Sequence, residues 1–150
     1  MKRIAMLGAE SSGKSTLCEA LARRHASVLV PEYLREFVDT MGRVPFEEDQ
    51  FDIARTQRAR EDAAALQARD YLFCDTTPLM TALYSRVYWG RVDAQLTELA
   101  RTHDYALTLV TAPTHPGHRM ACSANRRKCA SWCTAWCWRN CRNGASRTCW

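Results

Sequence analysis

The last 33 residues of the chain lack every acidic residue and most of the residues that form strands and cores. Between 118 and 150 there is no Asp, Glu, Leu, Ile, Val, Phe or Tyr. No run of β-branched or aromatic residues remains there, which excludes a strand. All sixteen acidic residues lie at or before Asp104, so residues 1–117 carry a formal charge of −2 (14 basic, 16 acidic) and the tail carries +7. The net charge of +5 therefore describes the tail and indicates no partner for the rest of the chain.

Cysteine, tryptophan and arginine fill this tail instead. It holds six of the eight cysteines, and Cys129, Cys133, Cys137 and Cys141 recur every four residues. That spacing falls within the range of zinc sites, so metal binding is one interpretation. A disulfide framework is a second, but it would need an oxidising compartment. A basic tail with tryptophans that binds nucleic acid is a third. The composition is abnormal for any folded segment and is typical of a GC-rich gene translated in a shifted frame. We therefore predict one domain over 1–117 and a disordered, metal-free tail over 118–150, with no specific nucleic-acid partner.

Export and membrane signals are also missing from the sequence. Lys2 and Arg3 are followed by only about five apolar residues, too few for a signal peptide, and no stretch approaches the roughly 20 apolar residues of a membrane span. Cys18 and Cys74 stand alone, which favours free thiols. We expect a cytoplasmic protein with no membrane partner; the sequence leaves the oligomeric state open.

The residues Gly8 to Ser15 form the phosphate-binding motif G-x-x-x-x-G-K-[ST]. An apolar strand precedes it, and a helical pattern begins inside it, which is the context that such a loop requires. Glycines let the backbone wrap around an anion, and amides at the start of the helix point at the phosphates. Lys14 is expected to reach the β- and γ-phosphates and Ser15 to bind Mg²⁺. The motif predicts binding of a nucleoside triphosphate.

Short apolar runs alternate with helical patterns along the rest of residues 1–117. The predicted strands are 3–7, 28–30, 71–74 and 105–110, and the predicted helices are 16–25, 32–41, 45–69, 78–89 and 93–101. This alternation predicts a parallel sheet with helices on both faces, in which ligands bind at the carboxyl ends of the strands.

Two carboxylates follow predicted strands at that edge, Glu32 after 28–30 and Asp75 after 71–74. In phosphoryl transfer one carboxylate usually holds the metal and another accepts the proton of the acceptor hydroxyl. The apolar strand before Asp75 matches the Walker B pattern. Either acid can instead cap the helix that follows it, so this alternative stays open.

Three motifs together resemble the ribosylnicotinamide kinase domain of NadR-type proteins, a group of P-loop nucleoside-kinase-like ATPases. They are Gly8-x-Glu10-Ser11-Ser12-Gly13-Lys14-Ser15-Thr16, Pro31-Glu32-Tyr33-x-Arg35-Glu36 and Asp75-Thr76-Thr77. The resemblance covers residues 1 to about 116. Members of the family continue into a lid helix with catalytic arginines, a fifth strand and a last helix, and nothing after residue 117 matches that pattern.

The resemblance implies phosphorylation of nicotinamide riboside by ATP and Mg²⁺ in NAD metabolism. The ATP-binding residues would be Gly8, Glu10, Ser11, Ser12, Gly13, Lys14, Ser15 and Thr16. Ser15 and Asp75 would hold the metal, and Glu32 is favoured over Asp75 as the base. Tyr84, Tyr88 or Trp89 would stack on the pyridinium ring of the substrate, although core packing explains each of them equally well.

Three functions therefore follow from the sequence. The first is a nucleoside kinase, the second is a P-loop ATPase or nucleotide-binding module without kinase activity, and the third is a truncated, inactive remnant. The missing lid pattern predicts low activity, since arginines that neutralise transition-state charge contribute about 10³-fold or more to the rate.

Overall fold

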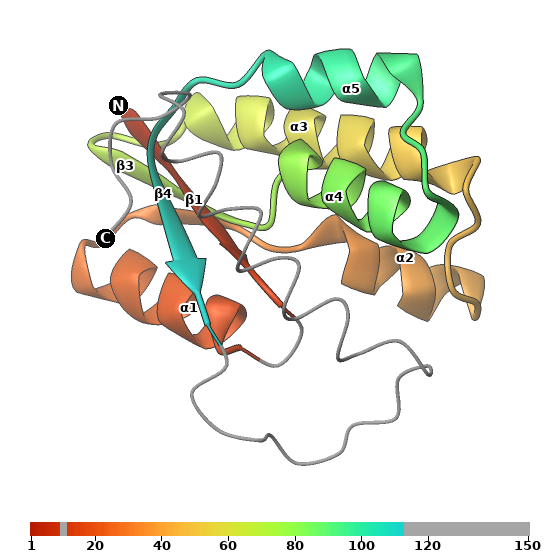
Figure 1. The fold of residues 1–150 in the computed structure, drawn as a ribbon. Helices are drawn as coiled ribbons and strands as arrows, with labels where there is room; N and C mark the ends of the chain where they lie inside the picture. Colours follow the sequence, from red (N-terminus) through yellow and green to blue (C-terminus); the bar gives the residue numbers. More distant parts are fainter. Residues whose placement is uncertain (10–11, 113–150) are drawn as a thin grey trace.

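The computed structural model of the protein describes residues 1–9 and 12–112 and has a parallel sheet with helices on both faces (Figure 1). Its elements, in chain order, are β1 (Lys2–Gly8), α1 (Lys14–Arg24), β2 (Val28–Val30), α2 (Tyr33–Met41), α3 (Asp49–Ala65), β3 (Tyr71–Asp75), α4 (Pro78–Trp89), α5 (Ala94–Arg101) and β4 (Tyr105–Thr111). The strand order is β2-β3-β1-β4, and all neighbours are parallel. The predicted P-loop NTPase-like α/β fold is confirmed. The predicted tail lies outside the described residues.

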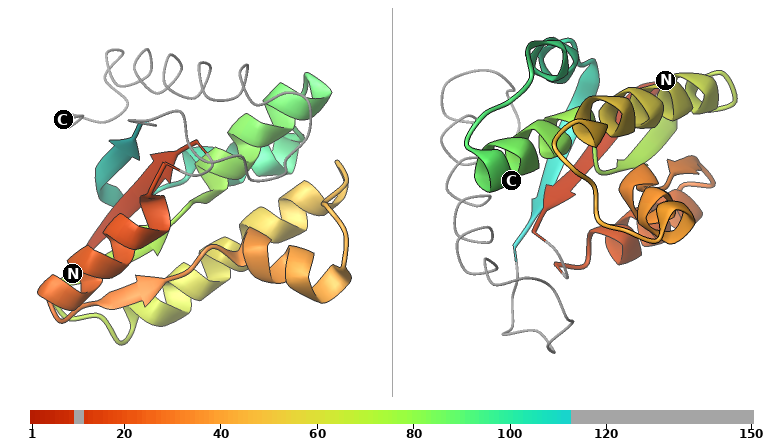
Figure 2. Two further views of the ribbon diagram at one scale, coloured as in Figure 1. Left: turned by 90° about the horizontal axis from the view of Figure 1, so that it is seen from below. Right: turned by 90° about the vertical axis from the view of Figure 1, so that its right-hand side faces the viewer.

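Alternate side chains of the strands pack on opposite faces of the sheet, as the period of a strand requires. α1 covers one face and α3 and α4 lie on the other, a separation that Figures 1 and 2 both show. The cluster under α1 is built from Ile4, Met6, Cys18, Ala22 and Phe73. The clusters of the other face are Leu7, Met80 and Leu83 under α4, and Val30, Leu72 and Cys74 under α3.

Most predicted elements have the expected limits, but α3 is shorter than predicted. It begins at Asp49 rather than Pro45 and ends at Ala65 rather than Arg69. The carboxylate of Asp49 explains the late start, because it accepts bonds from the Phe46 amide (2.7 Å) and from the Arg43 guanidinium (2.6 and 3.1 Å). These bonds fold the segment before Asp49 into a loop. The predicted first-turn residue Glu47 pairs with Arg91 instead.

The two cysteines of this part of the chain are buried free thiols, as predicted. Burial raises the pKa of Cys18 to about 12 and raises that of Cys74 as well, so both stay protonated at neutral pH. Among the described residues, no helix has both the length and the apolar character to cross a bilayer.

A buried carboxylic acid, which the sequence does not reveal, lies between α3 and the sheet. Glu61 is fully buried, and its carboxyl oxygen accepts a bond of 2.6 Å from the hydroxyl of Tyr105. Burial raises its pKa to about 7, against the lowering effects of the Tyr105 bond, Arg58 and Arg3. Since a raised carboxyl pKa favours the protonated form, this group stabilises the fold at low pH and loses that contribution as the pH rises to about 7.

Replacement of Glu61 by Gln should therefore remove much of the pH dependence of stability. An unfolded glutamate titrates near 4.3, so ionisation of buried Glu61 should cost the wild type on the order of 3 kcal/mol between about pH 5 and pH 8. Urea unfolding of Glu61→Gln at several pH values should show a flatter profile and higher stability at pH 8. Glu98→Gln, an exposed change on α5, should keep the wild-type slope. A wild-type slope in Glu61→Gln would contradict this assignment.

Candidate active site

The phosphate loop leaves the end of β1 at a glycine that no other residue can replace without strain. Gly8 has φ of 149°, and a Cβ atom there would come within 2.5 Å of the Thr111 carbonyl oxygen at the end of β4. Gly13, which precedes α1, has φ of 82°, in the left-handed region that favours glycine. The two glycines thus let the chain turn tightly between β1 and α1 while β4 lies directly alongside.

Lys14 is drawn into this loop by a backbone carbonyl. Its ammonium donates to the Ala9 carbonyl oxygen at 2.7 Å, and the side chain is almost fully buried. The Ser12 hydroxyl donates to the same carbonyl at 2.7 Å and lies 2.6 Å from the Thr111 hydroxyl, which ties the loop to β4. Ser15 is half-buried and Thr16 is exposed, while Glu10 and Ser11 lie outside the described residues.

Asp75 ends β3 beside the start of the phosphate loop. It pairs in register with Met6 of β1, and the amide of the next residue, Thr76, donates to the Met6 carbonyl at 3.1 Å. The Asp75 side chain is buried, and its Oδ1 atom has no hydrogen-bond partner in the described structure. Capping does not explain it, because no side chain caps α4. A buried carboxylate oxygen without a partner is a site for a cation or a water molecule.

Glu32 stands at the N-cap position of α2 but does not cap that helix with its side chain. Its carboxylate accepts a bond of 3.2 Å from the Thr76 hydroxyl and is 17% exposed. Burial raises its pKa; Lys14 lowers it, Asp75 raises it further, and Thr76 and Arg35 lower it. Lys14 and Asp75 lie at the same edge of the sheet as Glu32, so both charges act on the Glu32 carboxyl. Because Glu32 makes no capping bond, the capping alternative fails for Glu32 as well.

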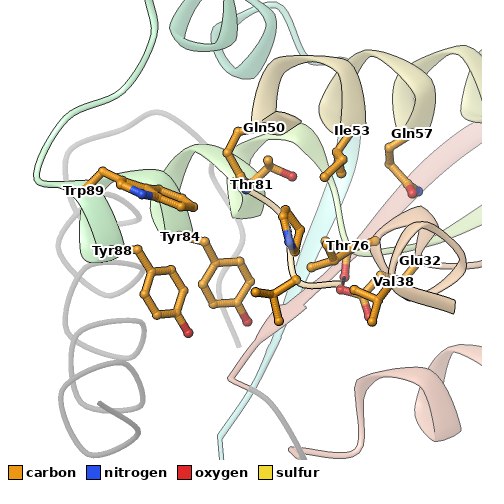
Figure 3. A pocket seen from close by; sticks show the side chains of 13 residues that line it. Glu32, Val38, Gln50, Ile53, Gln57, Thr76, Thr81, Tyr84, Tyr88 and Trp89 are labelled. Carbon is orange, nitrogen blue, oxygen red and sulfur yellow. Dashed lines mark hydrogen bonds between the residues drawn. The ribbon is translucent and has the colours of Figure 1, made fainter. Parts of the chain in front are cut away.

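A cavity of about 630 Å³ opens beside Glu32 (Figure 3). Tyr84, Tyr88 and Trp89 of α4 line one end, whereas Glu32 and Thr76 lie at the other, and Asp75 is not in the lining. Ring centroids of Tyr84 and Tyr88 are 6.2 Å apart, and those of Tyr88 and Trp89 are 5.8 Å apart. Tyr84 also packs on the core cluster under α4. The remaining lining residues are Leu34, Val38, Val44, Pro45, Gln50, Ile53, Gln57 and Thr81.

The charged groups of the site are unevenly distributed between the cavity and the phosphate loop. Among its described lining residues, Glu32 is the only charged one, and none is basic. The phosphate loop, by contrast, carries Lys14 and the amide end of α1. The site is thus divided into a side for anions and a side with a single negative charge.

The sequence indicated the carboxylates Glu32 and Asp75 and the aromatic residues at one end of the cavity. It did not indicate the lining residues that come from α3 and from the loop before it. Gln50, Ile53 and Gln57 come from α3, and Val44 and Pro45 from the loop before it. No local motif marks these residues, because they reach the cavity only when α3 packs across the sheet edge. Their spacing of three to four residues along a helix was the one signal available.

A protein-family model described as an AAA domain matches residues 3–137. The chain belongs to this AAA domain family. The match runs beyond residue 117, where the sequence resemblance was expected to end, so it includes part of the cysteine-rich segment. No curated protein matches the chain.

Solved structures show that the chain shares its P-loop fold with NadR proteins. A NadR protein in complex with NR has a TM-score of 0.78 at 19% identity over 93% of this chain. A NadR protein in complex with NAD and AMP-PNP has a TM-score of 0.75 at 20% identity over 95% of it. This chain covers 41% of the length of each NadR chain.

Loss of the Lys14 ammonium should weaken nucleotide binding severely, because no other side-chain cation faces the interior of the described part of the loop. Isothermal titration of Lys14→Ala with ATP and Mg²⁺ should show at least about a hundredfold weaker binding than the wild type. Lys2→Ala removes an exposed lysine at the opposite end of β1 and should bind normally. An unchanged affinity for ATP in a folded Lys14→Ala protein would contradict the assignment of the nucleotide site.

Proposed function

We propose that the protein is a kinase that transfers the γ-phosphoryl group of ATP to a nucleoside, with nicotinamide riboside as the best acceptor. The observation that carries the proposal is a cavity whose described lining residues include one carboxylate, Glu32, and no basic residue, while Glu32 also lies within the field of Lys14 of the phosphate-binding loop. The loop accounts for ATP, and the cavity accounts for an acceptor that bears no phosphate of its own. Cytoplasmic localisation is part of the proposal, since free thiols suit a reducing compartment.

The phosphate side would hold ATP through residues Gly8 to Thr16, including Glu10 and Ser11, with Lys14 on the β- and γ-phosphates. The residues present fit Mg²⁺, because Asp75 offers a buried, unpartnered oxygen and Ser15 a hydroxyl at the start of α1. Mg²⁺ commonly takes one or two protein carboxylates and completes its shell with phosphate oxygens and water, so these two residues are enough to hold it. Bound there, the ion would neutralise charge on the phosphates.

Glu32 is the proposed base on the acceptor side. It lines the cavity, whereas Asp75 does not, and burial raises its pKa toward the range in which a carboxylate accepts a proton well. The acceptor hydroxyl would give its proton to Glu32 as its oxygen bonds to the γ-phosphorus. The bond between that phosphorus and the bridging oxygen breaks, and ADP leaves with the electron pair.

Charge and shape support a cationic aromatic acceptor. Tyr84, Tyr88 and Trp89 offer ring faces on which a planar cation gains roughly 0.5–2 kcal/mol, and Glu32 provides the opposite charge. A second phosphate would meet this carboxylate with no basic residue beside it. NadR, which shares the fold, has been solved with NR, and the pyridinium of nicotinamide riboside has this charge and shape. At 19% identity the shared fold alone does not choose the acceptor.

A P-loop ATPase without an acceptor is the second candidate. It is favoured by the phosphate-binding loop and the family match, which account for a nucleotide without requiring an acceptor. Such a protein would hydrolyse ATP slowly and show no preference among added nucleosides. An inactive remnant would bind no ATP.

An acceptor series separates these candidates. ADP formation should be measured with ATP, Mg²⁺ and either nicotinamide riboside, its 5′-phosphate, uridine or no addition. We expect nicotinamide riboside to give the highest kcat/KM, uridine to react at least about tenfold less efficiently, and the 5′-phosphate to have no effect. Equal ADP formation in all four mixtures would favour the ATPase.

The two carboxylates should differ in their kinetic effects. Glu32→Gln should lower kcat by about 10²-fold or more and leave the Kd for ATP within about twofold, because the base acts only on the acceptor. Asp75→Asn should lower kcat and raise the Mg²⁺ concentration needed for half-maximal rate. Rates of both variants equal to the wild type would contradict the assignment of these acids. An effect on Mg²⁺ dependence from Glu32→Gln alone would exchange their roles.

A further inference from the structure

The residue that caps α2 is not the one at its N-cap position. A side chain at the N-cap position commonly accepts from the amide of the second or third helical residue, but Glu32 makes no such bond. The amide of Tyr33, the first residue of α2, donates to the side-chain oxygen of Gln57 at 2.9 Å. Gln57 belongs to α3, so this amide is satisfied from another helix. The Glu32 carboxylate, which does not cap α2, lines the cavity.

Gln57 is held so that its oxygen points at that amide. The side chain is 3% exposed, and Glu61 follows it by one turn on α3. The side-chain nitrogen of Gln57 has no hydrogen-bond partner in the described structure, and Gln57 contributes to lowering the pKa of the Glu61 carboxyl. The bond to the Tyr33 amide is therefore the one that fixes the direction of the Gln57 oxygen.

The hydroxyl of Thr76 contacts the Glu32 carboxylate, and the backbone of Thr76 has a conformation that threonine disfavours. Its φ is 73°, in the left-handed region, where a β-branched residue is a genuine outlier. Its amide is fixed by the Met6 carbonyl, and its hydroxyl donates to Glu32 at 3.2 Å. Figure 3 shows Thr76 and Glu32 meeting at one end of the cavity, with Gln57 nearby on α3. Strain of this kind persists where the surrounding structure imposes it, commonly at functional sites.

We infer that Gln57 and Thr76 are positioning residues that together hold the Glu32 carboxylate toward the acceptor cavity. Gln57 accepts from the first amide of α2, next to Glu32, and Thr76 fixes the Glu32 carboxylate through its hydroxyl. The role of Glu32 as base rests on the proposed function, whereas the bond to the Tyr33 amide and the strain are properties of the fold. Without the Gln57 oxygen the Tyr33 amide loses its partner and the start of α2 loosens, and without the Thr76 hydroxyl the carboxylate loses its fixed direction.

The strain is tested by a matched pair of variants. Thr77 is as buried as Thr76 but has an ordinary extended φ of −151°, and its hydroxyl has no partner in the described structure. Thr76→Gly and Thr77→Gly remove the same atoms, but only the former also relieves an unfavourable φ. The unfolding temperature should therefore fall less in Thr76→Gly, by about 3 °C or more. An equal or larger fall in Thr76→Gly would overturn the inference.

The capping is tested by amide hydrogen exchange. Gln57→Met keeps the length and apolar volume of the side chain but has no acceptor oxygen. The Tyr33 amide should then exchange at least about tenfold faster in NMR spectra, with amides of β1 unchanged. Equal exchange of Tyr33 in the variant and the wild type would also overturn the inference. Neither this measurement nor the thermal one depends on kinase activity.

The positioning is tested by kinetics with nicotinamide riboside. Thr76→Val and Gln57→Met should lower kcat by about tenfold or more and leave the KM for ATP within about twofold, while Thr76→Ser, which keeps the hydroxyl, should recover most of the rate. A fully active Thr76→Val protein refutes the inference and leaves the proposed kinase intact. If the wild type transfers phosphate to no acceptor, the proposed function fails. The thermal and exchange measurements then decide alone whether Gln57 and Thr76 hold the Glu32 carboxylate.

Discussion

Parallel pairing of β1 with β3 is the constraint on which the site depends. The register that sets Met6 opposite Asp75 brings the phosphate loop, which follows β1, beside Asp75 at the end of β3 and the two threonines after it. The Thr76 amide continues this ladder by donating to the Met6 carbonyl, and this bond helps to fix the left-handed turn that points its hydroxyl at Glu32. A slip of one residue would turn Asp75 to the other face of the sheet.

β4, which pairs with β1 on the side opposite to β3, contacts the phosphate loop as well. The Thr111 hydroxyl contacts Ser12, and its carbonyl approaches so closely that only glycine fits at position 8. Gly8 therefore has two roles, since the turn into the loop and the contact with β4 both need the space of a missing side chain. The sequence motif records the first role, but the second appears only with the position of β4.

Features encoded locally could be predicted from the sequence, and features made by contacts between distant elements could not. The strand before Asp75, the loop around Lys14 and the helix from Pro78 each have a pattern within a few residues. The start of α3 was predicted wrongly because Arg43 and Phe46 engage Asp49, a competition that the favourable position of Pro45 does not reveal. The bond of Gln57 to Tyr33 had no local signal, since the two residues lie 24 positions apart in different helices.

Glu32 stands at the N-cap position of α2, but its carboxylate makes no capping bond and lines the cavity instead. A capping bond to the second or third amide of the helix would take the carboxylate away from the cavity. Gln57 of α3 accepts from the first amide of α2, and Glu32 is the only charged residue among the described lining residues. The buried position of Glu32 then raises its pKa, while Lys14 and the Thr76 bond act against that rise. Its charge is therefore set by both sides of the site, so binding of an anion beside Lys14 should alter the affinity of Glu32 for a proton.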